Sequence, residues 1–172
     1  MSEFKLADTI GVDPIEARKI ITKFFSKVPK VKNFLDTLGA LASNRGYIKI
    51  PNPYGRIRFF PKYDVLKAYP NTKVKGKWLG EMSRAGKNTP IQGLNGNVIK
   101  LALIYVQRYI DANNIPVKIL LSIYDEIQTE CRKDFTEQWK GILEELMIKA
   151  AKVYVKSVPV EVDCKINDYW TK

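Results

Sequence analysis

The sequence predicts an α+β fold in which long helices pack with small antiparallel sheets. Apolar residues recur every three to four positions over most of the chain, as they do on the buried face of a helix. Short apolar runs also occur in two adjacent pairs, 47–50 with 56–60 and 117–124 with 127–132, a pattern typical of β-hairpins. Because only a few residues join each pair, its strands are expected to be antiparallel.

Composition excludes several classes of protein. The 172 residues are enough for one domain, or one domain with an appendage, and 45% hydrophobic content is ordinary for a globular protein. Without a long apolar run or a signal-peptide layout, no membrane partner is expected. Histidine is absent, which excludes histidine-dependent triads and most zinc sites. The two cysteines lack metal-ligand spacing and are expected to be reduced thiols in a cytosolic protein.

The net charge of +11 is concentrated in one segment. Residues 45–87 carry eleven basic and two acidic side chains, a net charge of +9, whereas residues 1–44 carry +2 and residues 88–172 carry equal numbers. Such a concentration is expected of a surface that faces phosphates. A solvated lysine-rich face without a partner is the alternative, and the charge alone favours nucleic acid.

Two amphipathic helices are predicted near the N-terminus, after a weakly helical segment at 2–10. Asp13 is the predicted N-cap of the first, with Pro14 in its first turn. Pro29 is expected to end this helix, and Gly46 the second. Both are interpreted as structural, with apolar stripes that face a core. The stripes are Ala17, Ile20, Ile21, Phe24 and Phe25, then Val31, Phe34, Leu35, Leu38 and Leu41.

The basic segment begins with the first predicted hairpin. Arg56 and Arg58 alternate with apolar residues, so both arginines are expected on one face of their strand. Residues 61–76 contain lysines and prolines without a clear period, and they predict a loop.

A long helix is predicted over about 77–113. Pro90 lies inside it and removes one backbone donor, so a kink or a break is expected there. Arg84, Asn88 and Gln92 are four residues apart and therefore share one face of this helix. Such a row of polar groups is commonly no more than a hydrated helix face.

The second predicted hairpin has an acidic tip. Asp125 and Glu126 lie between its strands, although neither residue readily takes the positive φ that hairpin turns favour. A divalent cation is one reason for such a pair, because Mg²⁺ prefers carboxylate oxygens and shares them with substrate phosphates. A solvated turn is the alternative.

Three features are predicted after this hairpin. Asp134 is the predicted N-cap of another amphipathic helix. Residues 158–166 predict a last strand. Trp170 is expected to pack against the C-terminal part of the chain.

Five short motifs also stand in a specific order. They are Gly46-Tyr47, Gly55-Arg56-Ile57-Arg58, Asn88-Thr89-Pro90-Ile91-Gln92-Gly93, Val98-Ile99-Lys100 and Tyr124-Asp125-Glu126. In order and spacing they resemble the C-terminal part of family A DNA polymerases, the bacterial repair and phage replication type. The first two resemble the hairpin before the long palm helix of that family, the next two resemble that helix, and the last resembles the third catalytic motif, usually His-Asp-Glu.

The resemblance implies a function and a division of the chain. It implies a fingers-derived helical segment at 1–45, a basic hairpin and loop at 46–76, and part of a palm at 77–172. It also implies DNA-directed DNA synthesis in replication or repair by a two-metal mechanism. Asp125 would hold Mg²⁺, and Glu126 would act beside it at the primer end. The expected partners are primer–template DNA and deoxynucleoside triphosphates, in the cytoplasm of a bacterium or a phage-infected host.

The resemblance implies DNA contacts as well. The residues concerned are Arg56, Arg58, Arg84, Asn88, Gln92, Lys100 and Tyr124. The three polar residues at four-residue spacing could touch the minor-groove acceptors, purine N3 and pyrimidine O2. Every base pair presents these acceptors, so such contacts depend little on sequence. The hairpin arginines and the lysines of residues 62–77 would contact phosphates.

The sequence departs from the family pattern in two ways. Tyr124 replaces the usual histidine. The tyrosine side chain is longer than that of histidine and is not cationic, but its phenol can still donate a hydrogen bond. The first carboxylate motif and the triphosphate-binding fingers helix have no counterpart here. We therefore expect the chain to need an N-terminal polypeptide and to be inactive alone.

The alternatives are a non-catalytic nucleic-acid-binding module, in which Asp125 is only a turn residue, and a helical interaction protein, which leaves the motif order unexplained.

Overall fold

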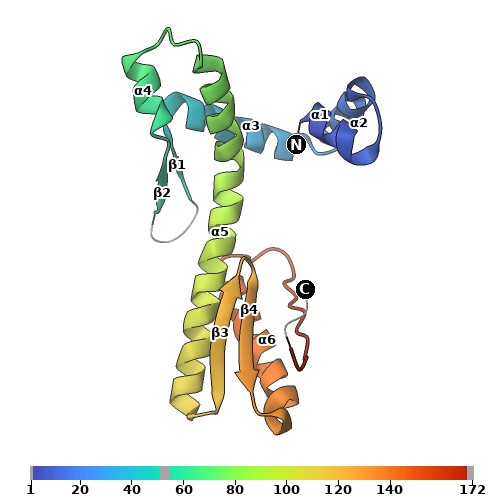
Figure 1. The fold of residues 1–172 in the computed structure, drawn as a ribbon, viewed down its shortest axis with the longest axis vertical. Coiled ribbons are helices and arrows are strands. Elements are labelled where there is room, and N and C mark those ends of the chain that lie inside the picture. Colours follow the sequence, from blue (N-terminus) through green and yellow to red (C-terminus); the bar gives the residue numbers. More distant parts are fainter. Residues whose placement is uncertain (1, 51–54, 170–172) are drawn as a thin grey trace. The chain divides into compact units, whose positions relative to one another are not determined.

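A computed structural model describes residues 2–50 and 55–169 and confirms the α+β fold (Figure 1). The helices are α1 (Glu3–Ile10), α2 (Pro14–Lys27), α3 (Pro29–Arg45), α4 (Lys62–Ala68), α5 (Lys75–Asn113) and α6 (Thr136–Lys152), with a 3₁₀ turn η1 (Lys133–Phe135) before α6. The strands are β1 (Tyr47–Lys49), β2 (Ile57–Phe59), β3 (Val117–Ile123) and β4 (Glu126–Cys131), paired as two hairpins. In these described ranges, no helix combines the length and apolar character needed to cross a membrane.

The chain forms two compact units. The first contains Met1–Ile48 and Ile57–Asn88, and the second contains Lys49–Arg56 and Thr89–Lys172. The division therefore falls inside α5. The three-part division at residues 46 and 77 remains a prediction.

The predicted ends of the N-terminal helices are confirmed. The Asp13 carboxylate accepts hydrogen bonds from the backbone N–H groups of Ile15 and Glu16, at 2.7 and 2.9 Å, and caps α2. Pro29 begins α3, so α2 ends at Lys27 just before it. Gly46 follows the end of α3 with φ at 74°, a left-handed conformation that glycine takes at little cost.

The predicted core-facing stripe of α2 is only partly buried. Ala17 is the buried residue of this helix, whereas Ile20 and Phe24 are 41% and 59% exposed. In α3, Leu38 packs on a core, but Phe34 is 53% exposed. Helical periodicity shows that a face is apolar and cannot show what covers it. The expectation that these faces point into a core of this chain is therefore wrong for Ile20 and Phe24 of α2 and for Val31 and Phe34 of α3.

The core of the first unit joins four of its elements and the residue after β2. Its buried residues are Ala42, Ile48, Phe60, Leu66 and Met82. α3 and α5 approach closely at Gly86, where an added Cβ would lie 2.4 Å from the Cβ atom of Ala42. This packing holds the start of α5, and with it Arg84, against α3 and the first hairpin.

Residues 62–68 form helix α4, so the predicted loop over 61–76 is wrong in this part. Leu66 is buried in the first core, and Tyr63 packs beside it. The Tyr63 hydroxyl donates a hydrogen bond to the Asn44 carbonyl at 2.8 Å. Seven residues are too few to display a helical period, and the stability of so short a helix comes from tertiary packing. Local sequence therefore predicted a loop.

Helix α5 continues without interruption through Pro90, so the predicted break does not occur. A proline removes one backbone hydrogen bond. The parts of α5 on either side are each secured by their own core, with Met82 in the first unit and Ala102 in the second. This packing outweighs the lost bond.

In the second unit, the β3–β4 hairpin packs with the rest of α5 and with α6. Val106 of α5, Val117 of β3 and Trp139 of α6 are buried together. The Trp139 indole N–H donates a hydrogen bond to the Thr129 hydroxyl of β4 at 2.8 Å. A neighbouring cluster buries Ile127 of β4 against Ala102. These contacts secure the base and the returning strand of the acidic hairpin.

Two predictions for the C-terminal part are wrong. Asp134 lies inside η1, where its carboxylate accepts a hydrogen bond from Arg132 at 2.9 Å, and Phe135 takes the N-cap position of α6. Residues 158–166 are described and are not assigned to a strand, because a strand needs a paired neighbour and Pro159 lacks an N–H to donate. The predicted packing of Trp170 lies outside the described residues.

Candidate catalytic hairpin and nucleic-acid interface

The β3–β4 hairpin turns at Tyr124 and Asp125. Ile123 pairs with Glu126, so Glu126 is the first residue of β4 and not part of the turn. The prediction of an Asp-Glu tip is corrected to a Tyr-Asp tip. Tyr124 has φ at 53°, the left-handed conformation that hairpin turns require and that a tyrosine adopts only at a cost. The turn thus places Asp125 directly beside a strained residue.

A bulge at Leu120 interrupts the register of this hairpin. Ile119 pairs with Thr129, and the next pair is Leu121 with Gln128, which leaves Leu120 as the extra residue. Ile119 packs on the core, whereas Leu120 and Leu121 are 55% and 39% exposed. Bulges bend a strand and are common beside active sites, where they re-aim a side chain. In β3 the bulge separates the packed Ile119 from the exposed Leu120 and Leu121, whereas Ile127 of β4 stays buried beside the tip.

The carboxylates at this tip are accessible. Asp125 and Glu126 are exposed, and the Gln128 amide donates a hydrogen bond to Glu126 at 3.0 Å. Oxygen ligands of this kind suit Mg²⁺. Among residues 2–50 and 55–169, however, no three acidic, cysteine or histidine side chains gather closely enough to hold a metal ion. A magnesium site at Asp125 therefore stays a prediction, and it would need ligands in addition to those of the described residues.

The predicted polar row lies in one uninterrupted helix. Arg84, Asn88 and Gln92 all belong to α5 and all are exposed. Asn88 is the last residue of the first compact unit, and Gln92 belongs to the second. Lys100, two turns further along α5, is exposed as well. Their roles on DNA remain predictions.

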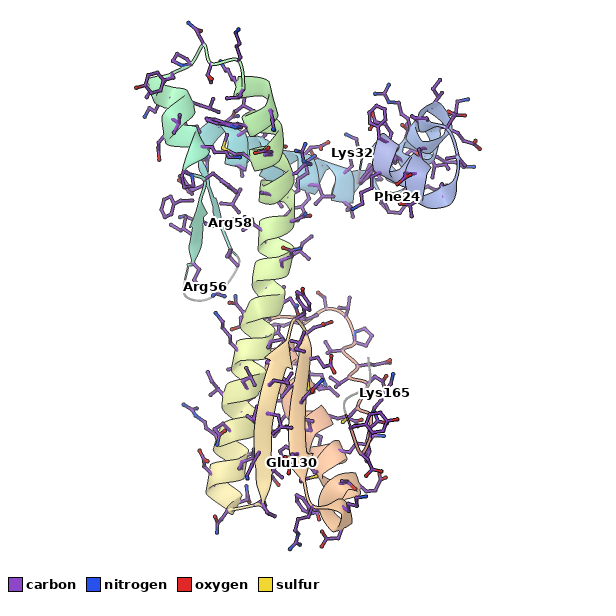
Figure 2. All side chains as sticks on the ribbon, viewed as in Figure 1. Phe24, Lys32, Arg56, Arg58, Glu130 and Lys165 are labelled. Carbon is purple, nitrogen blue, oxygen red and sulfur yellow. The ribbon has the colours of Figure 1, made fainter. Side chains whose placement is uncertain are left out.

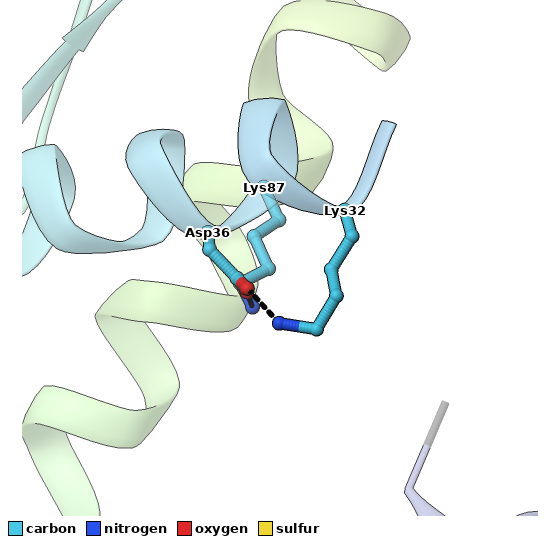
Figure 3. A network of polar contacts seen from close by, with 3 residues as sticks. All are labelled: Lys32, Asp36 and Lys87. Carbon is cyan, nitrogen blue, oxygen red and sulfur yellow. Dashed lines mark hydrogen bonds and ion pairs between the residues drawn. The ribbon is translucent and has the colours of Figure 1, made fainter. Parts of the chain in front are cut away.

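Asp36 of α3 binds two lysines beside this row (Figure 3). Lys32 donates to one carboxylate oxygen at 2.6 Å, and Lys87 of α5 donates to the other at 2.8 Å. Hydrogen bonds from Lys32 and then Lys87 lower the pKa of Asp36 from 3.8 to about 2. The sequence carries no signal for the contact between Asp36 and Lys87, because it joins residues far apart in the chain.

Basic groups also surround the first hairpin. Arg58 projects from β2, and Arg56 precedes that strand (Figure 2). The Arg58 guanidinium lies 5.4 Å from the centre of the Phe60 ring. Lys62 of α4 lies 5.6 Å from the centre of the Trp78 ring and pairs with Glu81. The exposed lysines further along this segment are Lys67, Lys73, Lys75 and Lys77.

Comparison with known proteins assigns the fold. The family model described as DNA polymerase family A matches residues 1–172. DNA polymerase I of Caldicellulosiruptor bescii is 31% identical over 172 residues, which are 100% of this chain and 19% of the relative. DNA polymerase I of Aquifex aeolicus is 41% identical over 132 residues, covering 68% of this chain and 23% of the relative.

A solved structure agrees with these relatives. The POL domain of Pol1 from M. smegmatis, in complex with DNA primer-template and dNTP, matches with a TM-score of 0.70 and 26% identity, over 87% of this chain and 24% of that chain. The architecture is therefore that of part of a polymerase domain. The chain belongs to DNA polymerase family A. It spans about a fifth of the length of the curated relatives it matches, 19% and 17% for two of them.

Proposed function

We propose that this chain supplies the C-terminal part of the catalytic domain of a DNA-directed DNA polymerase. Its reaction is template-directed nucleotidyl transfer in replication or repair, in the cytoplasm of a bacterium or a phage-infected host. One observation carries the proposal: the exposed Asp125 at the turn of a hairpin secured to α5 and α6, in a chain that matches the family over its whole length. The substrates are primer–template DNA and deoxynucleoside triphosphates, the ligands named for the M. smegmatis structure.

The acidic hairpin would take part in a two-metal site. Asp125 would be a ligand of Mg²⁺, and Glu126, already held by Gln128, would lie beside the primer end. When bound, the metal ions lower the pKa of the attacking hydroxyl and stabilise the charge on the leaving oxygens. The chain's own residues then position the DNA.

We propose further that the other metal ligands come from outside this sequence. The described residues hold no group of three acidic, cysteine or histidine side chains that could complete such a site. An N-terminal polypeptide with the missing carboxylate motif and a triphosphate-binding helix would supply them. The assembled enzyme is then this chain bound to that polypeptide, and the chain alone is expected not to extend a primer.

Primer extension with Mg²⁺ by the assembled enzyme tests this function. Asp125→Asn should lower the extension rate by roughly a thousandfold or more, because a lost metal ligand removes several kcal/mol of transition-state stabilisation. DNA affinity should change by less than about twofold, since Asp125 adds no attraction for phosphates. Asp134→Asn is the matched control, an exposed carboxylate in η1 that should leave the rate unchanged.

Near wild-type extension by Asp125→Asn would remove that residue from the metal site. Extension by this chain alone, absent in the Asp125→Asn form of the same chain, would show that no second polypeptide is needed.

The other candidate function is a non-catalytic DNA-binding module, favoured by the net charge of +9 in residues 45–87. Salt-sensitive DNA binding without any metal-dependent extension by the assembled enzyme would support that alternative.

A further inference from the structure

A small cavity lies beside the first hairpin, within the first compact unit. Its volume is about 250 Å³. Its lining includes Arg58, Phe60, Lys62, Glu81, Met82 and Ala85. Sites for drug-sized ligands are commonly ~300–1,000 Å³, so this cavity suits a single ring-sized group.

Part of the cavity lining is apolar and fixed. Phe60 is 8% exposed and Met82 is 2% exposed, and both belong to the core that also buries Ala42 and Ile48. Ala85 packs against the same core. The core therefore holds these side chains in place, and the small surface that they leave open forms an apolar wall of the cavity.

Two cations lie beside this apolar lining, and each is placed over an aromatic ring. The Arg58 guanidinium lies 5.4 Å from the centre of the Phe60 ring, and the Lys62 ammonium lies 5.6 Å from the centre of the Trp78 ring. These contacts favour positions beside the rings for both charges. Both belong to the segment of net charge +9, so a polyanion is attracted to this side of the unit.

Glu81 opposes that attraction. Its carboxylate accepts a hydrogen bond from Lys62, which lowers the pKa of Glu81 and keeps it ionised. A phosphate must compete with Glu81 for Lys62. The cavity therefore favours a ligand that adds apolar contact to its negative charge, because charge alone meets a competing carboxylate.

We propose that this cavity binds one unpaired base of a single-stranded nucleic-acid segment, with the adjoining phosphates at Arg58 and Lys62. A base presents an apolar face of ring size, and its phosphates supply the complementary charge. Such binding tolerates any sequence, because every base has a flat π-face. The inference rests on the proposed function, since the template of a polymerase continues as a single strand beyond the primer-paired duplex.

DNA binding by the full chain, measured by fluorescence anisotropy, tests the site. The probes are a blunt duplex, the same duplex with a short single-stranded extension, and the same extension made of abasic nucleotides. The normal extension should tighten binding by about tenfold over the blunt duplex, the size expected for one stacked base. The abasic extension keeps the phosphates and should lose most of that gain.

Substitutions locate the effect. Arg58→Ala and Lys62→Ala should each reduce the gain from the normal extension by roughly threefold or more, and Arg58→Lys should restore part of it. Lys73→Ala, an exposed lysine of the same basic segment outside the cavity, should weaken all three probes by the same factor. Glu81→Gln should tighten binding of the normal extension, because it removes the competing carboxylate. A variant that fails to fold cannot produce this increase.

The proposal would be overturned by equal affinity for the normal and abasic extensions, or by equal effects of Arg58→Ala and Lys73→Ala on every probe. Equal binding of blunt and extended DNA would reject the base cavity and leave the proposed polymerase function intact. Failure to bind even the blunt duplex would contradict the proposed function itself.

Discussion

Lys87 of α5 donates a hydrogen bond to Asp36 of α3 at 2.8 Å, one residue before Asn88 (Figure 3). The same carboxylate binds Lys32, so one acidic group partly neutralises two lysines. The contact joins two helices that also pack closely at Gly86. Asp36 therefore ties α5 to α3 beside Asn88, the middle residue of the polar row.

Asp36→Asn should destabilise the chain in a pH-dependent way. The folded-state pKa of Asp36, about 2, lies below its ordinary value of 3.8. Stability from this group is therefore fully present above about pH 4 and is lost as the pH falls through about 2. Because its side chain is 47% exposed, the loss should be at most about 1 kcal/mol.

The measurement is thermal unfolding of the wild type and Asp36→Asn across this pH range. The difference in Tm should shrink as the pH falls from 4 towards 2, and salt should reduce it at neutral pH. Asp8→Asn, an exposed carboxylate of α1, is the control and should shift Tm little. A difference in Tm that stays constant from pH 7 to 2 would mean that the ion pair contributes nothing.

Alanine substitutions of Arg84, Asn88 and Gln92 should lower discrimination against a mismatched primer end. The predicted contacts are hydrogen bonds to minor-groove acceptors, each contributing about 0.5–1.5 kcal/mol, so each loss should reduce discrimination by roughly 2- to 10-fold. Total DNA affinity should fall less, since the basic segment supplies most of it.

Primer extension from matched and mismatched ends by the assembled enzyme measures this discrimination. Gln107→Ala is the matched control, because Gln107 is also exposed on α5 and donates a hydrogen bond to Asp111. It should leave the ratio of the two rates unchanged. Equal slowing on both ends by Asn88→Ala and Gln92→Ala would argue against minor-groove contacts.

Gly86→Ala and Gly96→Ala should change stability in opposite directions. Both glycines lie in α5, where alanine is favoured by about 1 kcal/mol. At Gly86 an added Cβ would lie 2.4 Å from the Cβ of Ala42 and 3.0 Å from the Leu38 carbonyl oxygen, and such overpacking costs about 1–3 kcal/mol. At Gly96 the described structure has no atom within 4 Å of the added Cβ.

Urea unfolding of both variants decides between propensity and packing. We expect Gly96→Ala to raise the free energy of unfolding by about 0.5–1 kcal/mol, and Gly86→Ala to lower it by about 1–2 kcal/mol. Stabilisation by Gly86→Ala would show that α3 can move away from α5 at little cost.

Local signals in the sequence predicted many of the helix and strand positions. Asp13 and Gly46 mark helix ends through contacts within a few residues, which a sequence displays directly. Helix α4 depends on Leu66 entering a core built from other elements, and its own pattern is too short to show this. The exposed Phe24 of α2 shows the converse case, in which an apolar face is visible and its covering is not.

The candidate site divides in the same way. Asp125 and the row from Arg84 to Gln92 were found because motifs and helical spacing are local. Asp36 and Glu81 were missed, because each acts through a lysine distant in sequence, at 51 and 19 residues respectively. The predicted turn was wrong by one residue. Two adjacent carboxylates lie between the apolar runs and predicted an Asp-Glu turn, whereas the strand register puts Tyr124 and Asp125 in the turn.

Tyr124 has a strained backbone and is almost fully exposed. Its φ of 53° is unfavourable for a tyrosine, and its side chain gains little from packing because the residue is 90% exposed. Strained residues persist where the surrounding structure enforces them, here the paired strands β3 and β4, and they cluster at functional sites. Because it precedes Asp125 in the turn, we predict that its phenol contacts the primer end.

Tyr124→Gly and Tyr124→Phe should separate these two effects. Glycine relieves strain of about 1–2 kcal/mol and loses about 0.5–1 kcal/mol of backbone entropy, so we expect unfolding free energy to rise by about 0.5–1 kcal/mol. Phenylalanine keeps the strain and should leave stability unchanged.

Both variants lack the hydroxyl, so both should slow primer extension by the assembled enzyme by roughly 2- to 10-fold, the loss expected for one hydrogen bond. Tyr124→His should retain most of the rate, because an imidazole can donate a hydrogen bond and histidine tolerates positive φ. Wild-type extension by Tyr124→Phe would show that the hydroxyl makes no contact that matters, and the strain at this turn would then serve only to place Asp125.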